Sequence, residues 1–256
     1  MRADGEVEAV VVPCTICRSE MMRRRGRIGG EAMSERESLN VEIRRLWPSD
    51  IEAFRDHLLH LDARSRHERF GGGMSDDSLL HYVEHCFGQG DLLYGAFIDG
   101  HLCGAAELRS NQAIWREQAP FERHIHGEAA FSVETEHRRR GIGEKLFRRI
   151  QRAATNHGVE TIEIVCLPDN IGMLMLAQKF KTHFTFEENA LTGRLRARRP
   201  TAFSLMREAS GDILDFGAAL FDAQRRAFRD ARWRSARRRS DAELRLRKER
   251  MQLAAR

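Results

Sequence analysis

The sequence has no long uncharged apolar run, and this excludes a transmembrane helix of ordinary length. A secretory signal peptide is also absent, because the longest apolar run near the start, residues 9–12, precedes the positive charges instead of following them. Hydrophobic residues make up 41% of the chain, which is enough for a core. We therefore expect a soluble, cytoplasmic protein with no membrane partner.

Cysteine is scarce and odd in number, so the five cysteines form no evident disulfide framework. Cys14 and Cys17 have the spacing of a metal or redox pair, but neither a second pair nor a βαβ pattern accompanies them. His124 and His126 have no further ligand nearby in the sequence, which favours solvated loop histidines. The sequence thus predicts no metal site.

Sustained periodicity is absent from residues 1–38, which predicts a disordered leader. Met33, shortly before the first expected strand, is an alternative start of translation. Periodic elements fill residues 39–209, the expected folded domain. Residues 210–256 begin with apolar residues at helical spacing, which predicts a helical extension packed on the domain or on a second copy in a homodimer.

Acidic residues are sparse at the end of the chain. Residues 225–256 hold 13 Lys or Arg against four Asp or Glu, a local charge of +9 that leaves −4 for the rest, given the total of +5. Five arginines between residues 232 and 239 could neutralise phosphates, but Trp233 is the only aromatic residue interleaved with them. A solvated basic extension is therefore favoured over nucleic-acid binding.

Residues 128–146 pass from a strand-like alternation into a helical pattern through a basic turn with two glycines. Glycines at such a junction permit positive φ and close approach to a ligand, and the first N–H groups of the helix have no intrahelical partner. With the helix dipole and arginine side chains, these donors suit a diphosphate. The turn consists of Arg138, Arg139, Arg140, Gly141, Ile142 and Gly143.

Other elements follow from the same patterns. Helices are expected after Ser49, Ser75, Gly143 and Asp169, where capping or turn residues precede apolar periodicity. Asp99-Gly100 favours a hairpin. Strands are expected near residues 41–46, 92–98, 102–109, 128–133, 161–167, 183–187 and 191–195.

The pattern Arg138-x-x-Gly141-x-Gly143, between a strand and a helix, resembles the acetyl-CoA signature of the GNAT N-acetyltransferase superfamily. The order of elements from about Asn40 to about Arg207 is similar to that family too, and most of all to bacterial protein-lysine acetyltransferase domains. The resemblance implies an α/β (α+β) GNAT fold, with a mixed, mostly antiparallel central sheet flanked by helices and, here, a C-terminal helical extension. It also implies acetyl-CoA as co-substrate.

The resemblance also assigns roles in cofactor binding. The backbone of Phe131, Ser132 and Val133 would receive the acetyl carbonyl and the pantetheine arm. The turn from Arg138 to Gly143 would surround the diphosphate, and Asn170 would reach the cofactor from the following helix. Residues 65–73 would line the acceptor side, although they also suit a glycine-rich connector.

Glu128 is the catalytic base that the resemblance implies, because it stands in a similar Glu-x-x-x-x-Val pattern. A base is needed because a free lysine has a pKa near 10.4 and must lose a proton before it attacks the thioester directly. Burial against Phe131 or Trp115 would raise the pKa of Glu128 towards the working range.

One position departs from the family pattern. Ala177 stands where many members carry a tyrosine that protonates the leaving thiolate, and Lys181 replaces a glycine that often follows. Three functions therefore stay open: N-acetylation of a protein lysine, N-acetylation of a small-molecule amine, and a non-catalytic acyl-CoA sensor or adaptor.

Overall fold

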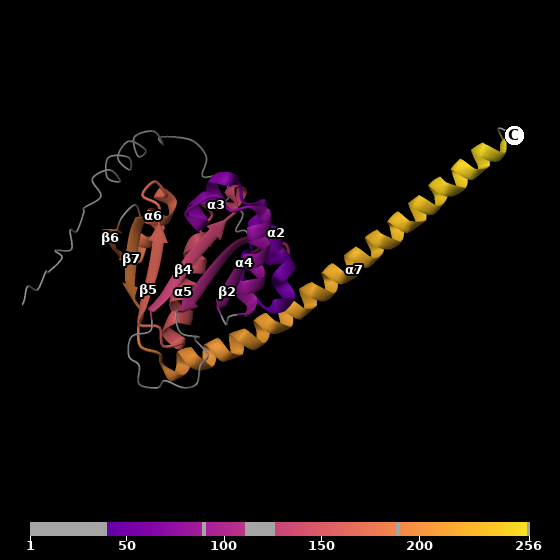
Figure 1. Ribbon diagram of the computed structural model, residues 1–256. Helices are drawn as coiled ribbons and strands as arrows, with labels where there is room; N and C mark the ends of the chain where they lie inside the picture. The colour runs from indigo at the N-terminus through magenta and orange to yellow at the C-terminus, as the bar shows by residue number, and fades with distance from the viewer. Residues whose placement is uncertain (1–39, 89–90, 111–125, 188–189, 255–256) are drawn as a thin grey trace, which may run out of the picture.

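The computed structural model describes residues 40–88, 91–110, 126–187 and 190–254. The predicted leader, with Cys14 and Cys17, and residues 111–125, which include Trp115 and His124, lie outside these residues. Within them, the strands form one sheet in the order β1-β2-β3-β4-β5-β7-β6 (Figure 1). The strands are β1 (Glu42–Arg45), β2 (Leu92–Ile98), β3 (His101–Ser110), β4 (His126–Val133), β5 (Thr161–Cys166), β6 (His183–Glu187) and β7 (Ala190–Arg196).

Strand pairing is antiparallel except between β4 and β5, which run parallel. The helical elements are η1 (Pro48–Asp50), α2 (Ile51–His60), α3 (Ala63–Phe70), α4 (Asp76–Gly88), η2 (Thr135–His137), α5 (Ile142–Asn156), α6 (Ile171–Lys179) and α7 (Ala202–Ala254). The mixed, mostly antiparallel sheet flanked by helices confirms the predicted fold class. Residues 65–73 are largely helical, because Asp62 caps α3 and Gly71, at φ +70°, ends it.

Two apolar cores lie on opposite faces of the sheet. On one face, α5 packs Leu146 and Phe147 against the central strands, and on the other α2 and α4 contribute Phe54, Leu58 and Leu79. All seven residues of β2 are buried because helices cover this strand on both sides. Neighbouring residues of a central strand therefore face different helices.

Helix α7 runs along the base of the domain and then extends well beyond it (Figure 1). The positions that face the domain recur at steps of three or four residues and are mostly acidic: Glu208, Asp212, Asp215, Ala219 and Asp222. We call these five residues the acidic seam. Its carboxylates bind the guanidinium groups of Arg44, Arg45 and Arg149.

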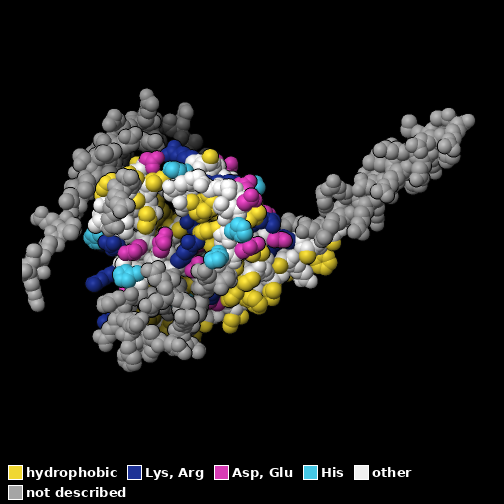
Figure 2. All heavy atoms as spheres, viewed as in Figure 1, with side chains coloured by type: hydrophobic (Ala, Val, Ile, Leu, Met, Phe, Trp, Pro, Cys, Tyr) yellow, Lys and Arg dark blue, Asp and Glu magenta, His cyan; other side chains and the backbone are white. Residues whose placement is uncertain are grey.

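Most large apolar residues of α7 do not pack on the domain, which was one of the two expected partners; packing on a second copy stays a prediction. Ile213, Leu220 and Phe228 are exposed, and such side chains line this part of the helix in Figure 2. Phe216 packs edge-on against a domain residue, Trp47, with ring centroids 5.3 Å apart. The helix is continuous through residue 210, where the sequence analysis placed a domain boundary.

No helix among the described residues is both long and apolar enough to cross a membrane.

Candidate functional site

Strands β4 and β5 pair only at their beginnings. The paired positions run from His126–Thr161 to Glu128–Glu163, although β4 continues to Val133 and β5 to Cys166. Beyond Glu128 the two strands therefore separate and leave a wedge in the middle of the sheet. We refer to this opening as the β4–β5 wedge.

Backbone donors of β4 face this wedge at alternate residues. The N–H of Glu134 donates to the carbonyl of Cys103 on β3 at 3.0 Å. In an antiparallel pair the hydrogen-bonded positions alternate, so the N–H of Ser132 also faces β3. The N–H groups of Phe131 and Val133 point the other way, into the wedge. Of the three predicted positions, two thus offer a donor to a ligand in the wedge.

The basic turn leads from the end of β4 into α5. Gly141 is the N-cap of α5 at φ +81°, and Arg139 also has a positive φ of 61°. No side chain caps the helix, so the first N–H groups of α5, from Ile142 and Gly143, have neither an intrahelical nor a side-chain acceptor. A helix start of this kind suits an anion, and the binding of a diphosphate here stays a prediction.

The three arginines of the turn differ in their surroundings. Arg138 donates through Nε to the carbonyl of Val133 at 3.1 Å and through Nη2 to Ser65 Oγ at 2.8 Å, and it lies 3.8 Å from a carboxylate oxygen of Glu68. Its side chain therefore joins the turn to α3. Arg139 and Arg140 are exposed.

Helix α6 packs beside the start of α5. A Cβ atom placed on Gly143 would lie 3.3 Å from Leu176 Cδ2, so glycine allows the two helices to approach closely. Asn170, predicted to reach the cofactor, is the N-cap of α6, and its Oδ1 accepts the N–H of Met173 at 3.0 Å. Ala177 is fully buried, and as an alanine it offers no hydroxyl at the position of the family's tyrosine.

Glu128 lies at the last paired position of β4, where the wedge opens. Its side chain is exposed, opposite Arg109 on β3 and beside Glu163 on β5. Phe131 cannot bury it, because residues three apart on a strand face opposite sides and Phe131 stacks on Phe147 of α5. The expectation of burial by Phe131 was therefore wrong.

Glu107, on the face of the sheet that carries Glu128, was missed by the sequence analysis. This carboxylate is buried and accepts a hydrogen bond from the hydroxyl of Tyr82 at 2.6 Å. It also pairs with Arg69 at 2.9 Å and Arg109 at 3.2 Å. Burial and this carboxylate raise the pKa of Tyr82 far above its ordinary value, which keeps the phenol protonated.

A second group missed by the sequence analysis surrounds Glu134, between β4 and the turn. Glu134 Oε1 lies 3.2 Å from His57 Nδ1, and Oε2 lies 2.9 Å from His101 Nε2. Burial lowers the pKa of His57, so we assign a neutral ring that donates through Nδ1 to Glu134 and accepts the Ser132 hydroxyl at Nε2, 2.9 Å away. Burial alone would raise the pKa of Glu134, but its histidine partners lower it to about 2.

Residues 55–181 match the model of the acetyltransferase (GNAT) family. Among solved structures, the GNAT domain of S. lividans PAT is 20% identical, with a TM-score of 0.51 over 61% of this chain and 90% of that domain. A Salmonella typhimurium protein solved with its cofactor acetyl-CoA is 19% identical, covers 63% of this chain and 96% of its own, and has a TM-score of 0.45.

An N-acetyltransferase from Staphylococcus aureus is 18% identical, with a TM-score of 0.45 over 62% of this chain and 99% of its own. No curated protein matches the sequence. The family match runs from within α2 to the end of α6 and includes the wedge and the basic turn, and the fold is similar to that of the S. lividans domain. Through this domain, the chain belongs to the GNAT acetyltransferase family.

Proposed function

We propose that this protein is an acetyl-CoA-dependent N-acetyltransferase that acts on a primary amine, with a protein lysine as the favoured acceptor. The main support for this function is the β4–β5 wedge, which lies beside the uncapped start of α5. The two features present backbone donors to a thioester arm and to a diphosphate, respectively. Together they fit the thioester-bearing pantetheine arm and the diphosphate of acetyl-CoA, which supplies an activated acetyl group as a thioester.

The chain's residues have distinct roles in this proposal. The N–H groups of Phe131 and Val133 hold the pantetheine arm and orient the acetyl carbonyl. The N–H groups of the first turn of α5, with Arg139 and Arg140 nearby, hold the diphosphate. Asn170 fixes the start of α6, which packs against that turn. Holding the reactants in this way removes much of the entropic barrier to direct attack.

Glu128 is the proposed base that takes the proton of the acceptor amine. It lies at the vertex of the wedge, next to the strand backbone that orients the acetyl group, and its exposure leaves it within reach of an entering amine. Asp91, close enough to Glu128 to be affected by its charge, has a pKa raised to about 6, mainly by burial. These carboxylates favour a cationic acceptor such as lysine.

The test is an assay of thiol release by purified protein with acetyl-CoA, against a panel of small amines, a panel of proteins, and buffer alone. Release that depends on a protein acceptor, with acetyl-lysine found by mass spectrometry, supports the full proposal. Release with small amines alone would replace the acceptor and keep the reaction. Binding of acetyl-CoA without release in any panel would contradict enzymatic function.

That last outcome would favour a non-catalytic acyl-CoA sensor. The specific observation behind it is the fully buried Ala177, which leaves the leaving thiolate without the family's tyrosine. A sensor would keep the wedge and the uncapped helix, so only turnover separates the two functions.

A further inference from the structure

Three of the chain's 11 histidines lie around one buried carboxylate, and a fourth lies beside one of them. Glu134 follows β4, His101 begins β3, and His137 ends η2, directly before the basic turn. His57 lies beneath the carboxylate on α2, and the ring centroid of His60 is 6.2 Å from that of His101. None of these residues has a role in the proposed acetyl transfer.

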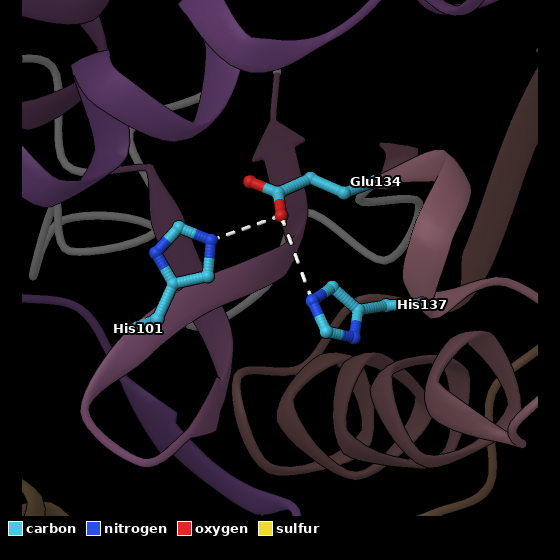
Figure 3. A group of neighbouring side chains, drawn as sticks. All are labelled: His101, Glu134 and His137. Carbon is cyan, nitrogen blue, oxygen red and sulfur yellow. Dashed lines mark hydrogen bonds and ion pairs between the residues drawn. The ribbon is translucent and has the colours of Figure 1, made fainter.

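Two of the rings are aimed at the same carboxylate oxygen (Figure 3). His101 Nε2 is 2.9 Å from Glu134 Oε2, and His137 Nε2 is 4.0 Å from it. All three ligand atoms lie within 4.8 Å of one another. A tetrahedral zinc ion has bonds of about 2.0–2.1 Å to nitrogen and oxygen, so its neighbouring ligand atoms stand about 3.3 Å apart. The distances of 2.9 and 4.0 Å lie on either side of that separation.

Hydrogen bonding accounts for His101 but leaves His137 unexplained. The 4.0 Å separation is too long for a hydrogen bond, although the ring points at the carboxylate. Its Nδ1 is buried and has no hydrogen-bond partner among the described residues. An ion between the two rings would give Nε2 of His137 the partner that direct contact does not provide.

The surroundings of Glu134 match those of a ligating carboxylate. His57 holds Oε1 from below at 3.2 Å and is itself fixed by Ser132 at 2.9 Å, so Oε2 is the oxygen that is turned toward the other rings. Hydrogen-bond partners of this kind orient metal ligands and are found at most protein metal sites. The carboxylate is 5% exposed, whereas His101 is 52% exposed, so a cation could enter from the His101 side.

We propose that Glu134, His101 and His137 bind a divalent cation of the zinc class, and that the cation fixes the end of β4 and the start of the basic turn. Two imidazoles and one carboxylate suit such ions, whereas Mg²⁺ prefers oxygen ligands. The ion would link β3 to η2 immediately before Arg138. It would therefore stabilise the segment that positions the turn, with a fourth ligand position left to water.

The direct test is a titration of the full chain, without an affinity tag or acetyl-CoA, with Zn²⁺, Co²⁺ and Mg²⁺. Cys14 and Cys17 are changed to serine in every sample, because that pair could itself bind zinc. We expect one Zn²⁺ or Co²⁺ per chain, a Co²⁺ absorption spectrum without thiolate bands, and a rise in melting temperature. Mg²⁺ should produce none of these effects. If the protein that keeps Glu134, His101 and His137 binds neither Zn²⁺ nor Co²⁺, the proposal is overturned.

Variants locate the ion. His101→Ala and His137→Ala should each weaken Zn²⁺ binding by at least about 100-fold, since even partners outside the ligand set change metal affinity by about 10- to 100-fold. His183→Ala, at an exposed histidine of β6, is the matched control and should bind as the parent does. Melting temperatures without metal check that all variants fold. Equal Zn²⁺ binding by the His101 and His137 variants and the control would refute the assignment.

This test is independent of the enzymatic proposal, because its readouts are metal content, spectrum and stability. Loss of acetyl transfer in all proteins would contradict the proposed function and leave the cation site standing. Loss of metal binding with intact turnover would do the reverse.

Discussion

In the proposed function, loss of Glu128 should affect the chemical step and not acetyl-CoA binding, because Glu128 lies at the wedge but outside the turn proposed to hold the diphosphate. Glu128→Gln keeps the shape of the side chain and removes its ability to take a proton. We expect turnover to fall by roughly 10²- to 10⁴-fold, with little change in acetyl-CoA affinity. The limb of the pH–rate profile that belongs to this carboxylate should disappear.

Glu163→Gln is the matched control for that variant, because Glu163 is the neighbour of Glu128 on β5 and pairs with Arg194 at 2.9 Å. Steady-state kinetics and calorimetric binding are measured on both proteins. Equal turnover in Glu128→Gln and Glu163→Gln would show that another group or a water chain takes the proton.

Asp62 is a residue whose contribution to stability should depend on pH. It accepts hydrogen bonds from the N–H and hydroxyl of Ser65 and from the hydroxyl of Thr135, each at 2.7 Å, and these lower its pKa to about 2 from 3.8. Asp62→Ala should reduce the free energy of unfolding by about 0.5–2 kcal/mol at neutral pH, the usual cost of losing a helix cap.

The sign of the pH dependence follows from the depressed pKa of Asp62. The stabilisation by its charge is fully present above about pH 4 and is lost as the pH falls toward 2, so the two proteins should converge in acid. Denaturant unfolding of wild type and Asp62→Ala between pH 7 and 3 measures the difference. Asp62→Asn keeps a hydrogen-bond acceptor but removes the charge. If the difference in free energy of unfolding between wild type and Asp62→Asn did not change with pH, the charge of Asp62 would not be the origin of the stabilisation.

At the scale of elements, α7 depends on buried ion pairs, and Arg149 is central to them. Its Nη1 lies 2.6 Å from Glu208 Oε1, and its guanidinium lies over the ring of Tyr94 at 4.2 Å. Arg149→Met leaves Glu208 buried without its main partner and should lower the free energy of unfolding by about 3–5 kcal/mol. Denaturant melts of the single variant and of Arg149→Met with Glu208→Leu test this. The double variant, in which neither member of this buried pair remains, should recover most of the loss.

Most elements could be predicted from the sequence because their signals are local. The alternation around Phe131, the Asp99-Gly100 turn and the apolar helix of Leu146 each depend on neighbouring residues. Lys181, flagged as a replacement for glycine, has a positive φ of 58° and follows α6 in a Schellman motif, where the N–H of Thr182 donates to the carbonyl of Ala177. The backbone conformation that favours glycine is thus present although the residue is a lysine.

The features that the sequence analysis missed depend on partners far away in the chain. Helix α3 has little apolar periodicity, although the Asp62 and Ser65 capping pair was a local signal for it. The acidic seam of α7 could not be recognised because its carboxylates pair with arginines of β1 and α5, which lie far away in the sequence. Glu134 and His101 are 33 residues apart, and only the β3–β4 pairing brings them together.

At the scale of the whole molecule, the described contacts between α7 and the domain come from the first half of the helix. The last described ion pair between them joins Arg226 to Asp50 at 3.4 Å. Removal of residues 232–256 should therefore change the melting temperature by no more than about 2 °C. Removal of everything from Glu208 onward should lower it by at least about 6 °C, because Arg44 and Arg149 are then left without their α7 partners. Equal melting temperatures for the two truncations would contradict this division.

The β4–β5 wedge also determines how fast amide hydrogens exchange with solvent. The amide of Ser132 is bonded to β3 and should exchange slowly, whereas its neighbours Phe131 and Val133, although central in the sheet, should exchange as fast as residues at a sheet edge. Saturating acetyl-CoA should slow exchange at these two amides and leave Ser132 unchanged. Amide exchange followed residue by residue in NMR spectra would show alternating protection along a single strand, which becomes uniform when the ligand takes the place of the missing part of β5.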